Sequence, residues 1–113
     1  MADALKVAYA TVTGTSGVGD SEDQILAASS ATITVLSVTL CNTEASDDAD
    51  FDLYIRDNNG SDIFYIYKNQ SLPSLSTFEH TSKIVLQDTD TLNCVLSADS
   101  QDIDVIISYL NQT

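Results

Sequence analysis

Basic residues are scarce in this chain of 113 residues. Four Lys and Arg stand against 17 Asp and Glu, which gives a net charge of -13. Binding to nucleic acid phosphates and to anionic membrane surfaces depends on Lys and Arg, so we expect neither partner. No apolar run approaches the ~20 residues that a membrane span requires. The opening residues, MADALKVAYA, lack the basic and long apolar regions of a secretion signal, so none is predicted.

Residues that carry chemistry are also few. The chain has a single histidine, His80, and no Cys or Ser is placed to form a triad or a zinc site with it. It contains no Gly-x-Ser-x-Gly motif, no Cys–His pair and no phosphate-binding loop. We therefore predict that the protein is not an enzyme. His80 is expected at a strand end or an interface.

The two cysteines, Cys41 and Cys94, both lie in predicted strands. Their wide spacing is like that of the inter-sheet disulfide of immunoglobulin domains, but the chain has no Trp to pack on such a bond. Without a secretion signal, two buried free thiols are the preferred interpretation. A disulfide is the alternative.

Short β-rich runs dominate what is present. Hydrophobic residues make up 43% of the chain, and they recur with a period of two between turn residues rather than with the helical period. This pattern predicts an all-β protein, an antiparallel β-sandwich of jelly-roll or immunoglobulin-like type with seven to eight strands joined mostly by hairpins. The length suits one domain over residues 1–113. Three of the four glycines predict a flexible loop at about 13–22.

The clearest strand pair is Phe51 to Arg56 with Ile63 to Lys68. Asn59-Gly60 between them favours a type I′ turn. Within Ala31 to Asn42 the apolar parity changes near Val35 and Leu36, which indicates a bulge, a bend or a change of sheet. The remaining predicted strands are Leu5 to Val12, Ile25 to Leu26, Ser76 to His80, Lys83 to Leu86, Leu92 to Leu96 and Ile103 to Leu110.

The last predicted strand is apolar on both faces. One face carries Ile103, Val105, Ile107 and Tyr109, and the other carries Ile106 and Leu110 among polar residues. A second apolar face needs a cover, either a neighbouring subunit or the chain's own N-terminal segment. We therefore hypothesise an interface between subunits of a homo-oligomer, such as a trimer, formed by Leu5, Val7, Tyr9, Ile106 and Leu110.

Two further clusters offer alternatives. Asp47, Asp48, Asp50 and Asp52 carry oxygens that Ca²⁺ accepts. The cluster lacks EF-hand spacing, so a solvated loop is the preferred interpretation and no cofactor is required. Asp88-Thr89-Asp90 is interpreted as a turn whose Asp side chains cap backbone N–H groups.

The aromatic cluster lies in the clearest hairpin. Tyr54, Tyr65 and Tyr67, with Arg56, could bind glycans if they share an exposed face. Ordinary cross-strand packing is the preferred interpretation.

An ordered series of segments carries a family resemblance. The segments are ATITVLSVTLCNTEAS, FDLYIRD, IFYIYKNQSLPSLSTFEH, KIVLQDTDTLNCVLSA and DIDVIISYLNQT. Over about residues 24–113 the chain resembles the small β-sandwich virion proteins of tailed bacteriophages. Where that family has a glycine before an Asp-x-Leu turn, this chain has Thr89.

The resemblance implies a non-catalytic structural protein of the virion, made in the host cytoplasm. It would serve as a capsid decoration or cement subunit, or as a neck or tail accessory. Its expected partners are further copies of itself and other virion proteins, such as the major capsid protein. The alternative is a fibre-type adhesin or carbohydrate-binding module, with or without Ca²⁺.

Overall fold

The computed structural model describes residues 3–13, 24–57, 62–96 and 102–112. These residues form nine strands, one more than the upper estimate from the sequence, and contain no helix long and apolar enough to cross a membrane. The strands are β1 (Asp3–Thr13), β2 (Gln24–Ala27), β3 (Thr32–Asn42), β4 (Ala49–Arg56), β5 (Ile63–Leu72), β6 (Thr77–His80), β7 (Ile84–Leu86), β8 (Thr91–Leu96) and β9 (Asp102–Gln112).

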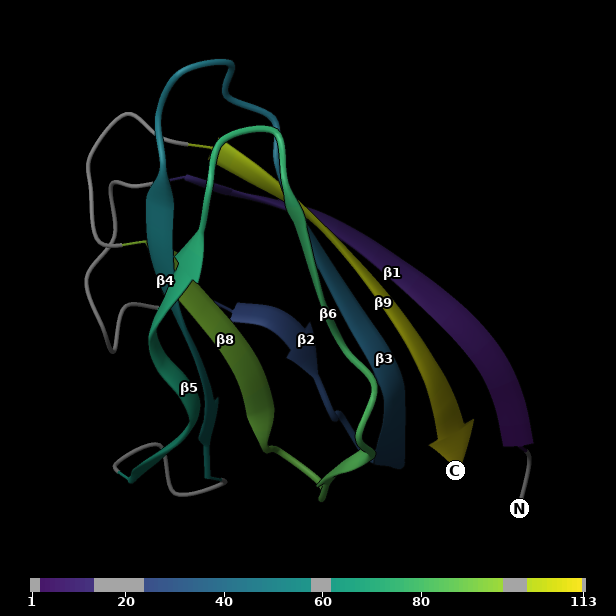
Figure 1. Cartoon of the computed structure of the whole chain (residues 1–113). Helices are drawn as coiled ribbons and strands as arrows, with labels where there is room; N and C mark the ends of the chain where they lie inside the picture. The colour runs from purple at the N-terminus through teal and green to yellow at the C-terminus, as the bar shows by residue number, and fades with distance from the viewer. Residues whose placement is uncertain (1–2, 14–23, 58–61, 97–101, 113) are drawn as a thin grey trace.

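The strands form two antiparallel sheets that pack face to face (Figure 1). One sheet has the order β1-β9-β3-β6, with β7 also paired to β3, and we call it the long sheet. The other has the order β2-β8-β4-β5, and we call it the short sheet. The predicted antiparallel β-sandwich is therefore confirmed.

The strand order defines the topology as a jelly roll. Along the chain nearly every connection crosses from one sheet to the other, and among the described strands only β4 and β5 are both consecutive and paired. If β6 and β7 are counted as one strand, each sheet has four strands. The strand orders β1-β9-β3-β6 and β2-β8-β4-β5 are then those of the two sheets of a jelly roll. The expectation of mostly hairpin connections was wrong, because pairing here joins strands that are distant in sequence. The predicted type I′ turn and nearly all of the predicted flexible loop lie outside the described residues.

The core lies between the two inner faces. Period-two alternation buries one side of each long strand, so that β9 contributes Ile103, Val105 and Ile107, and Tyr109 packs against them. The other large buried side chains include Ile33, Leu40, Phe51, Leu53, Leu72, Leu86 and Leu92.

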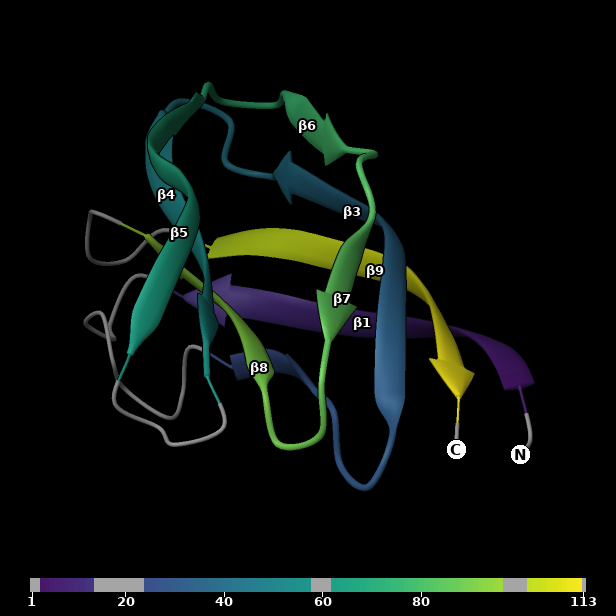
Figure 2. The ribbon, with the colours of Figure 1, turned by 90° about the horizontal axis from the view of Figure 1, so that it is seen from below.

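A bulge bends β3 at the point where the apolar parity changes. The register with β9 shifts between Val35 and Ser37, as the sequence predicts. On one side of the bend β3 pairs with β7, and on the other side it pairs with β6 (Figure 2). The bend therefore explains why two short strands share one edge of the long sheet.

The turn at Asp88-Thr89-Asp90 has the predicted capping. Gln87 N donates to Asp90 Oδ2 at 3.0 Å, and Ser30 N donates to Asp88 Oδ1 at 2.7 Å. Thr89 adopts a φ of 71°, a left-handed conformation that glycine adopts most readily.

Candidate functional site on the outer face of β1 and β9

Apolar side chains from two adjacent strands form one stripe on the outer face of the long sheet. Antiparallel pairing places Leu5 opposite Leu110 and Tyr9 opposite Ile106, with Val7 between them opposite a serine. We call these five residues the apolar stripe. They are the residues that the sequence analysis proposed as an interface. The structure brings them together on one face, and their role as an interface stays a prediction.

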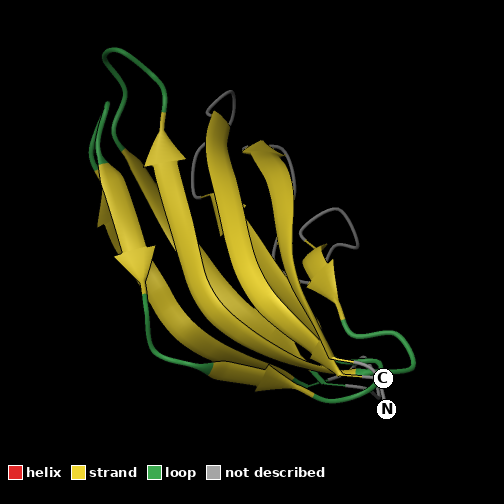
Figure 3. Ribbon diagram, turned by 90° about the vertical axis from the view of Figure 1, so that its right-hand side faces the viewer, coloured by secondary structure: helices red, strands yellow, loops and turns green. Residues whose placement is uncertain are grey.

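The stripe is open to solvent. The exposed fraction is 74% for Leu5, 47% for Val7, 76% for Tyr9 and 42% for Ile106, and Leu110 is half-buried. The chain's N-terminal strand does not cover β9, because β1 extends the sheet beside it (Figure 3). The sequence left two possible covers for the second face of β9, a neighbouring subunit or the chain's own N-terminal segment. The described part of β1 does not act as that cover. The alternate residues of the two strands face the core: Ala8, Ala10, Val12, Ile103, Val105 and Ile107.

Polar side chains bound the stripe on one side and the sheet edge bounds it on the other. Across β9, Leu110 lies opposite Thr34 of β3 and Ile106 lies opposite Thr39. On the far side of β1 no strand follows among the described residues. The stripe therefore runs up to a free sheet edge.

A shallow hollow of about 340 Å³ lies at one end of the stripe. Polar groups enter it beside the exposed Tyr9 ring, because Thr11 Oγ1 donates to Asp104 Oδ1 at 3.4 Å. This hollow was not predicted from the sequence. Only the shared outward parity of Tyr9 and Thr11 could have indicated it, since the pairing partner Asp104 is distant in the chain. The lining residues are Tyr9, Ala10, Thr11, Asp104, Val105 and Ile106.

The exposed tyrosine face considered for glycan binding does not form. Tyr54 has the predicted outward parity but is 0% exposed, and only Tyr65 of the three is exposed. Tyr67 lies on the inner face, because β5 bulges at Ile66 and the bulge reverses the expected parity. Tyr54 and Tyr65 contact each other with ring centroids 5.8 Å apart. These rings pack as ordinary cross-strand partners.

Tyr67 instead bridges the two sheets. Its hydroxyl lies 2.8 Å from Nδ1 of His80, and its ring packs edge-on against Phe51 and Phe78. His80 ends β6, at a strand end as predicted, and is buried. The fourth residue considered for glycan binding, Arg56, is half-buried, and its buried Nε makes no hydrogen bond to a described residue.

The acidic cluster does not converge on a metal. Among the described residues no group of three or more His, Cys, Asp or Glu could hold an ion. Asp47, Asp48 and Asp50 are exposed, and Asp48 Oδ1 accepts a hydrogen bond from Ser74 N at 2.9 Å. This is the arrangement of a solvated loop, which was the preferred interpretation.

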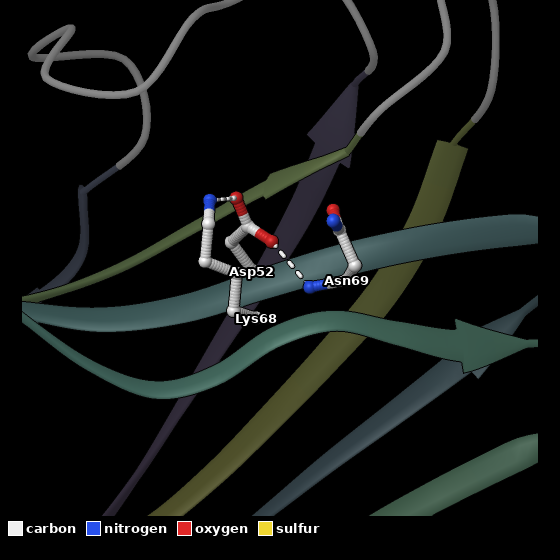
Figure 4. A network of polar contacts seen from close by, with 3 residues as sticks. All are labelled: Asp52, Lys68 and Asn69. Carbon is white, nitrogen blue, oxygen red and sulfur yellow. Dashed lines mark hydrogen bonds and ion pairs between the residues drawn. The ribbon is translucent and has the colours of Figure 1, made fainter.

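Asp52 stabilises the bulged strand. It is 7% exposed, and its Oδ1 accepts a hydrogen bond from Asn69 N at 2.7 Å (Figure 4). Asn69 has a φ of 53°, so this bond holds a left-handed residue in place. Lys68 Nζ lies 3.7 Å from Asp52 Oδ2 and 4.4 Å from the centroid of the Tyr65 ring. The carboxylate is therefore part of the fold and is not directed at a ligand.

Neither Cys41 nor Cys94 is part of a disulfide. Cys94 is buried, as predicted, whereas Cys41 is only half-buried because it lies on the outer parity of β3. The alternative of an inter-sheet disulfide does not hold.

Comparison with known proteins identifies no relative by sequence. No family model matches the chain, and no curated protein matches it. Among solved structures, the chain is similar to the CBM22-1 xylan-binding domain of Paenibacillus barcinonensis Xyn10C, with a TM-score of 0.47 and 12% identity. The likeness covers 74% of this chain and 56% of that domain. It concerns the arrangement of strands, and a shared arrangement does not imply a shared ligand.

Proposed function

We propose that this chain is a non-catalytic structural protein of a phage virion, which assembles as a homo-oligomer through the apolar stripe. The observation that carries the proposal is the stripe itself, which exposes apolar side chains of adjacent strands on a chain with a net charge of -13. Monomeric soluble proteins rarely expose large contiguous apolar patches, and such patches often mark interaction sites.

Two further features support this proposal without being specific to it. The ordered segments over about residues 24–113 resemble virion proteins of tailed phages. The jelly roll recurs in viral capsid proteins and in lectins, so the fold is compatible with a particle role and with a glycan-binding role alike. A strongly acidic exterior keeps a protein soluble at high copy number and away from packaged DNA.

The assembly is tested by a pair of charge substitutions. Ile106→Asp introduces a carboxylate into the stripe opposite Tyr9. It is expected to abolish association through the stripe, which light scattering after size exclusion would measure as a lower mass. The control is Leu75→Asp, which adds the same charge at a site that is 67% exposed, in the turn before β6. Its φ of 57° suits Asp better than Leu. An oligomer whose mass is unchanged by Ile106→Asp would show that the stripe is not an interface.

The place on the particle is tested by counting copies. Purified virions from the source would be analysed by quantitative mass spectrometry against the major capsid protein. A copy number similar to that of the capsid protein supports a decoration or cement subunit, and a small fraction of it supports a neck or tail accessory. Absence from the particles would reject the virion role.

Glycan binding is the second candidate, and the hollow beside Tyr9 favours it. An exposed aromatic ring next to hydroxyl and carboxylate groups is a suitable surface for a sugar, and here Thr11 and Asp104 supply those groups. Calorimetric titration with soluble oligosaccharides, with Ca²⁺ and with EDTA, would test binding and its metal dependence. Tyr9→Ala should abolish the heat and Tyr65→Ala should not. No heat with the unmodified chain would reject this candidate.

A further inference from the structure

Three of the four sheet edges are unsuited to pairing with another chain. The edge strand β2 has four residues and a register shift, and β6 and β7 have four and three residues. The strand β5 is longer, but its ladder to β4 shifts twice and Asn69 has a left-handed conformation. Short, bulged or charged edge strands are the usual protection against edge-to-edge association.

The fourth edge, β1, has almost none of these protections. It has 11 residues, contains neither Pro nor Gly, and pairs with β9 at 11 consecutive positions without a shift. It lies at the margin of the long sheet, with no described strand hydrogen-bonded beyond it (Figure 2). A long, regular edge presents a row of unpaired backbone N–H and C=O groups that can pair with another strand.

We propose that the occupant of this edge is β1 of a second copy, paired antiparallel about a two-fold axis at Val7. This inference rests on the proposed assembly as a homo-oligomer, and it adds an edge contact to the contact made through the apolar stripe. A two-fold axis makes the interface self-complementary. Two long sheets then form one continuous sheet, and the dimer replaces the trimer considered from the sequence.

The side chains of β1 favour this register over one centred on Lys6 and over any centred between two residues. With the axis at Val7, Leu5 lies opposite Tyr9 of the partner subunit, and apolar cross-strand pairs stabilise a sheet. With the axis at Lys6, two ammonium groups lie opposite each other, which is destabilising. An axis between two residues would place odd positions opposite even ones, and the two stripes would then lie on opposite faces of the joined sheet.

Charge also favours a second copy at this edge. The described part of β1 carries one Asp and one Lys, so the strand has no net charge although the chain is at -13. Lys6 has the inward parity, and such a charge on an edge strand hinders pairing unless it has room. In the proposed register it lies opposite Ala8 of the partner subunit, a small side chain. Lys6 therefore disfavours the register with the axis at Lys6 and is compatible with the register with the axis at Val7.

The two stripes merge in this dimer. Across the joined sheet, Leu110 and Leu5 of one copy lie in one row with Tyr9 of the partner subunit. The two-fold axis generates a second, equivalent row that runs in the opposite direction. The merged band is wider than either stripe and its side chains remain open on the face of the sheet. Edge pairing therefore uses the backbone of β1 and leaves the apolar side chains available for a further layer of assembly.

Single cysteines test the register in a Cys41→Ser background, in which the remaining Cys94 is fully buried. Val7→Cys places the two thiols opposite each other across the axis. Leu5→Cys and Tyr9→Cys are matched controls, whose thiols are offset by four residues, about 13 Å along the strand. A disulfide needs Cα atoms within about 7 Å, so we expect about tenfold more oxidised dimer for Val7→Cys than for either control.

The outcomes separate this inference from the proposed function. If the Cys41→Ser parent is a monomer by mass, the proposed assembly fails and this contact fails with it. If the parent is an oligomer but Leu5→Cys or Tyr9→Cys cross-links as well as Val7→Cys, assembly stands and the edge contact is overturned. Hydrogen exchange on the unmodified chain is a second readout, because dilution should remove protection from alternate amides of β1. Protection that does not depend on concentration overturns the proposal.

Discussion

The outer faces of the two sheets differ although both have alternating strands. On the long sheet the outward residues Tyr9 and Ile106 are 76% and 42% exposed. On the short sheet the outward residues Tyr54, Asn93 and Val95 are 0%, 2% and 5% exposed. The position of a residue in the alternation therefore predicts which face of the sheet its side chain lies on. It does not predict whether that side chain is buried or exposed. A binding surface has to be sought on the open face.

The largest expected effect compares two tyrosines at outward positions. Tyr54→Ala should destabilise the fold by about 4 kcal/mol, because it removes a large buried ring. Tyr9→Ala should change the free energy of unfolding by less than about 0.5 kcal/mol, because that ring is exposed. Both are measured by urea denaturation at low protein concentration in an Ile106→Asp background, so that association through the stripe does not contribute. If the two substitutions lower the free energy of unfolding equally, the outer faces of the two sheets do not differ in burial as described.

The second comparison uses two outward carboxylates. Asp52→Ala should cost about 2 kcal/mol, because the N–H of the left-handed residue Asn69 loses its acceptor in a partly buried hydrogen bond. The ion pair with Lys68 adds little, since the lysine side chain is 57% exposed. Among contacts between described residues, Asp104→Ala removes the 3.4 Å contact from Thr11 Oγ1, and it should be near neutral. The same denaturation series measures both, and a costly Asp104→Ala would show that the open face is also structural.

The smallest expected effect compares two short polar side chains. Asn93→Ala should cost about 1 kcal/mol, because Asn93 Nδ2 donates to Thr91 O and Thr91 Oγ1 at 3.1 and 2.9 Å. Ser108→Ala on β9 should lie within about 0.5 kcal/mol of the parent. Thermal melts of the two variants resolve the difference. If Ser108→Ala costs more than Asn93→Ala, the two faces are not distinguished by burial.

Local pattern predicted a large part of this fold. The alternation in Ile103 to Leu110 predicted which residues of β9 face the core and which face outward. The parity change at Val35 and Leu36 predicted the bulge in β3. The residues of the stripe followed from the same alternation, because β1 and β9 are regular over their whole length.

Non-local features could not be predicted in this way. Strand order depends on pairings between segments that lie far apart in the chain, in one case more than a hundred residues, as for Asp3 with Gln112. The local period carries no information on such pairings. The bulge at Ile66 placed Tyr65 and Tyr67 on opposite faces, although their spacing alone predicts one shared face. The burial of Tyr54 depends on groups outside its own strand.

The position of β9 in the long sheet has a consequence for how the chain folds. In sequence β9 follows all the other described strands, yet in space it lies between β1 and β3 (Figure 1). Neither neighbour can complete its ladder until β9 inserts between them, so a loop spanning almost the whole chain must close first. Folding dominated by such non-local pairing is slow, on the order of milliseconds to seconds. Until β9 arrives, β1 is an unpaired strand on both sides, and this interval is when the chain is most exposed to aggregation.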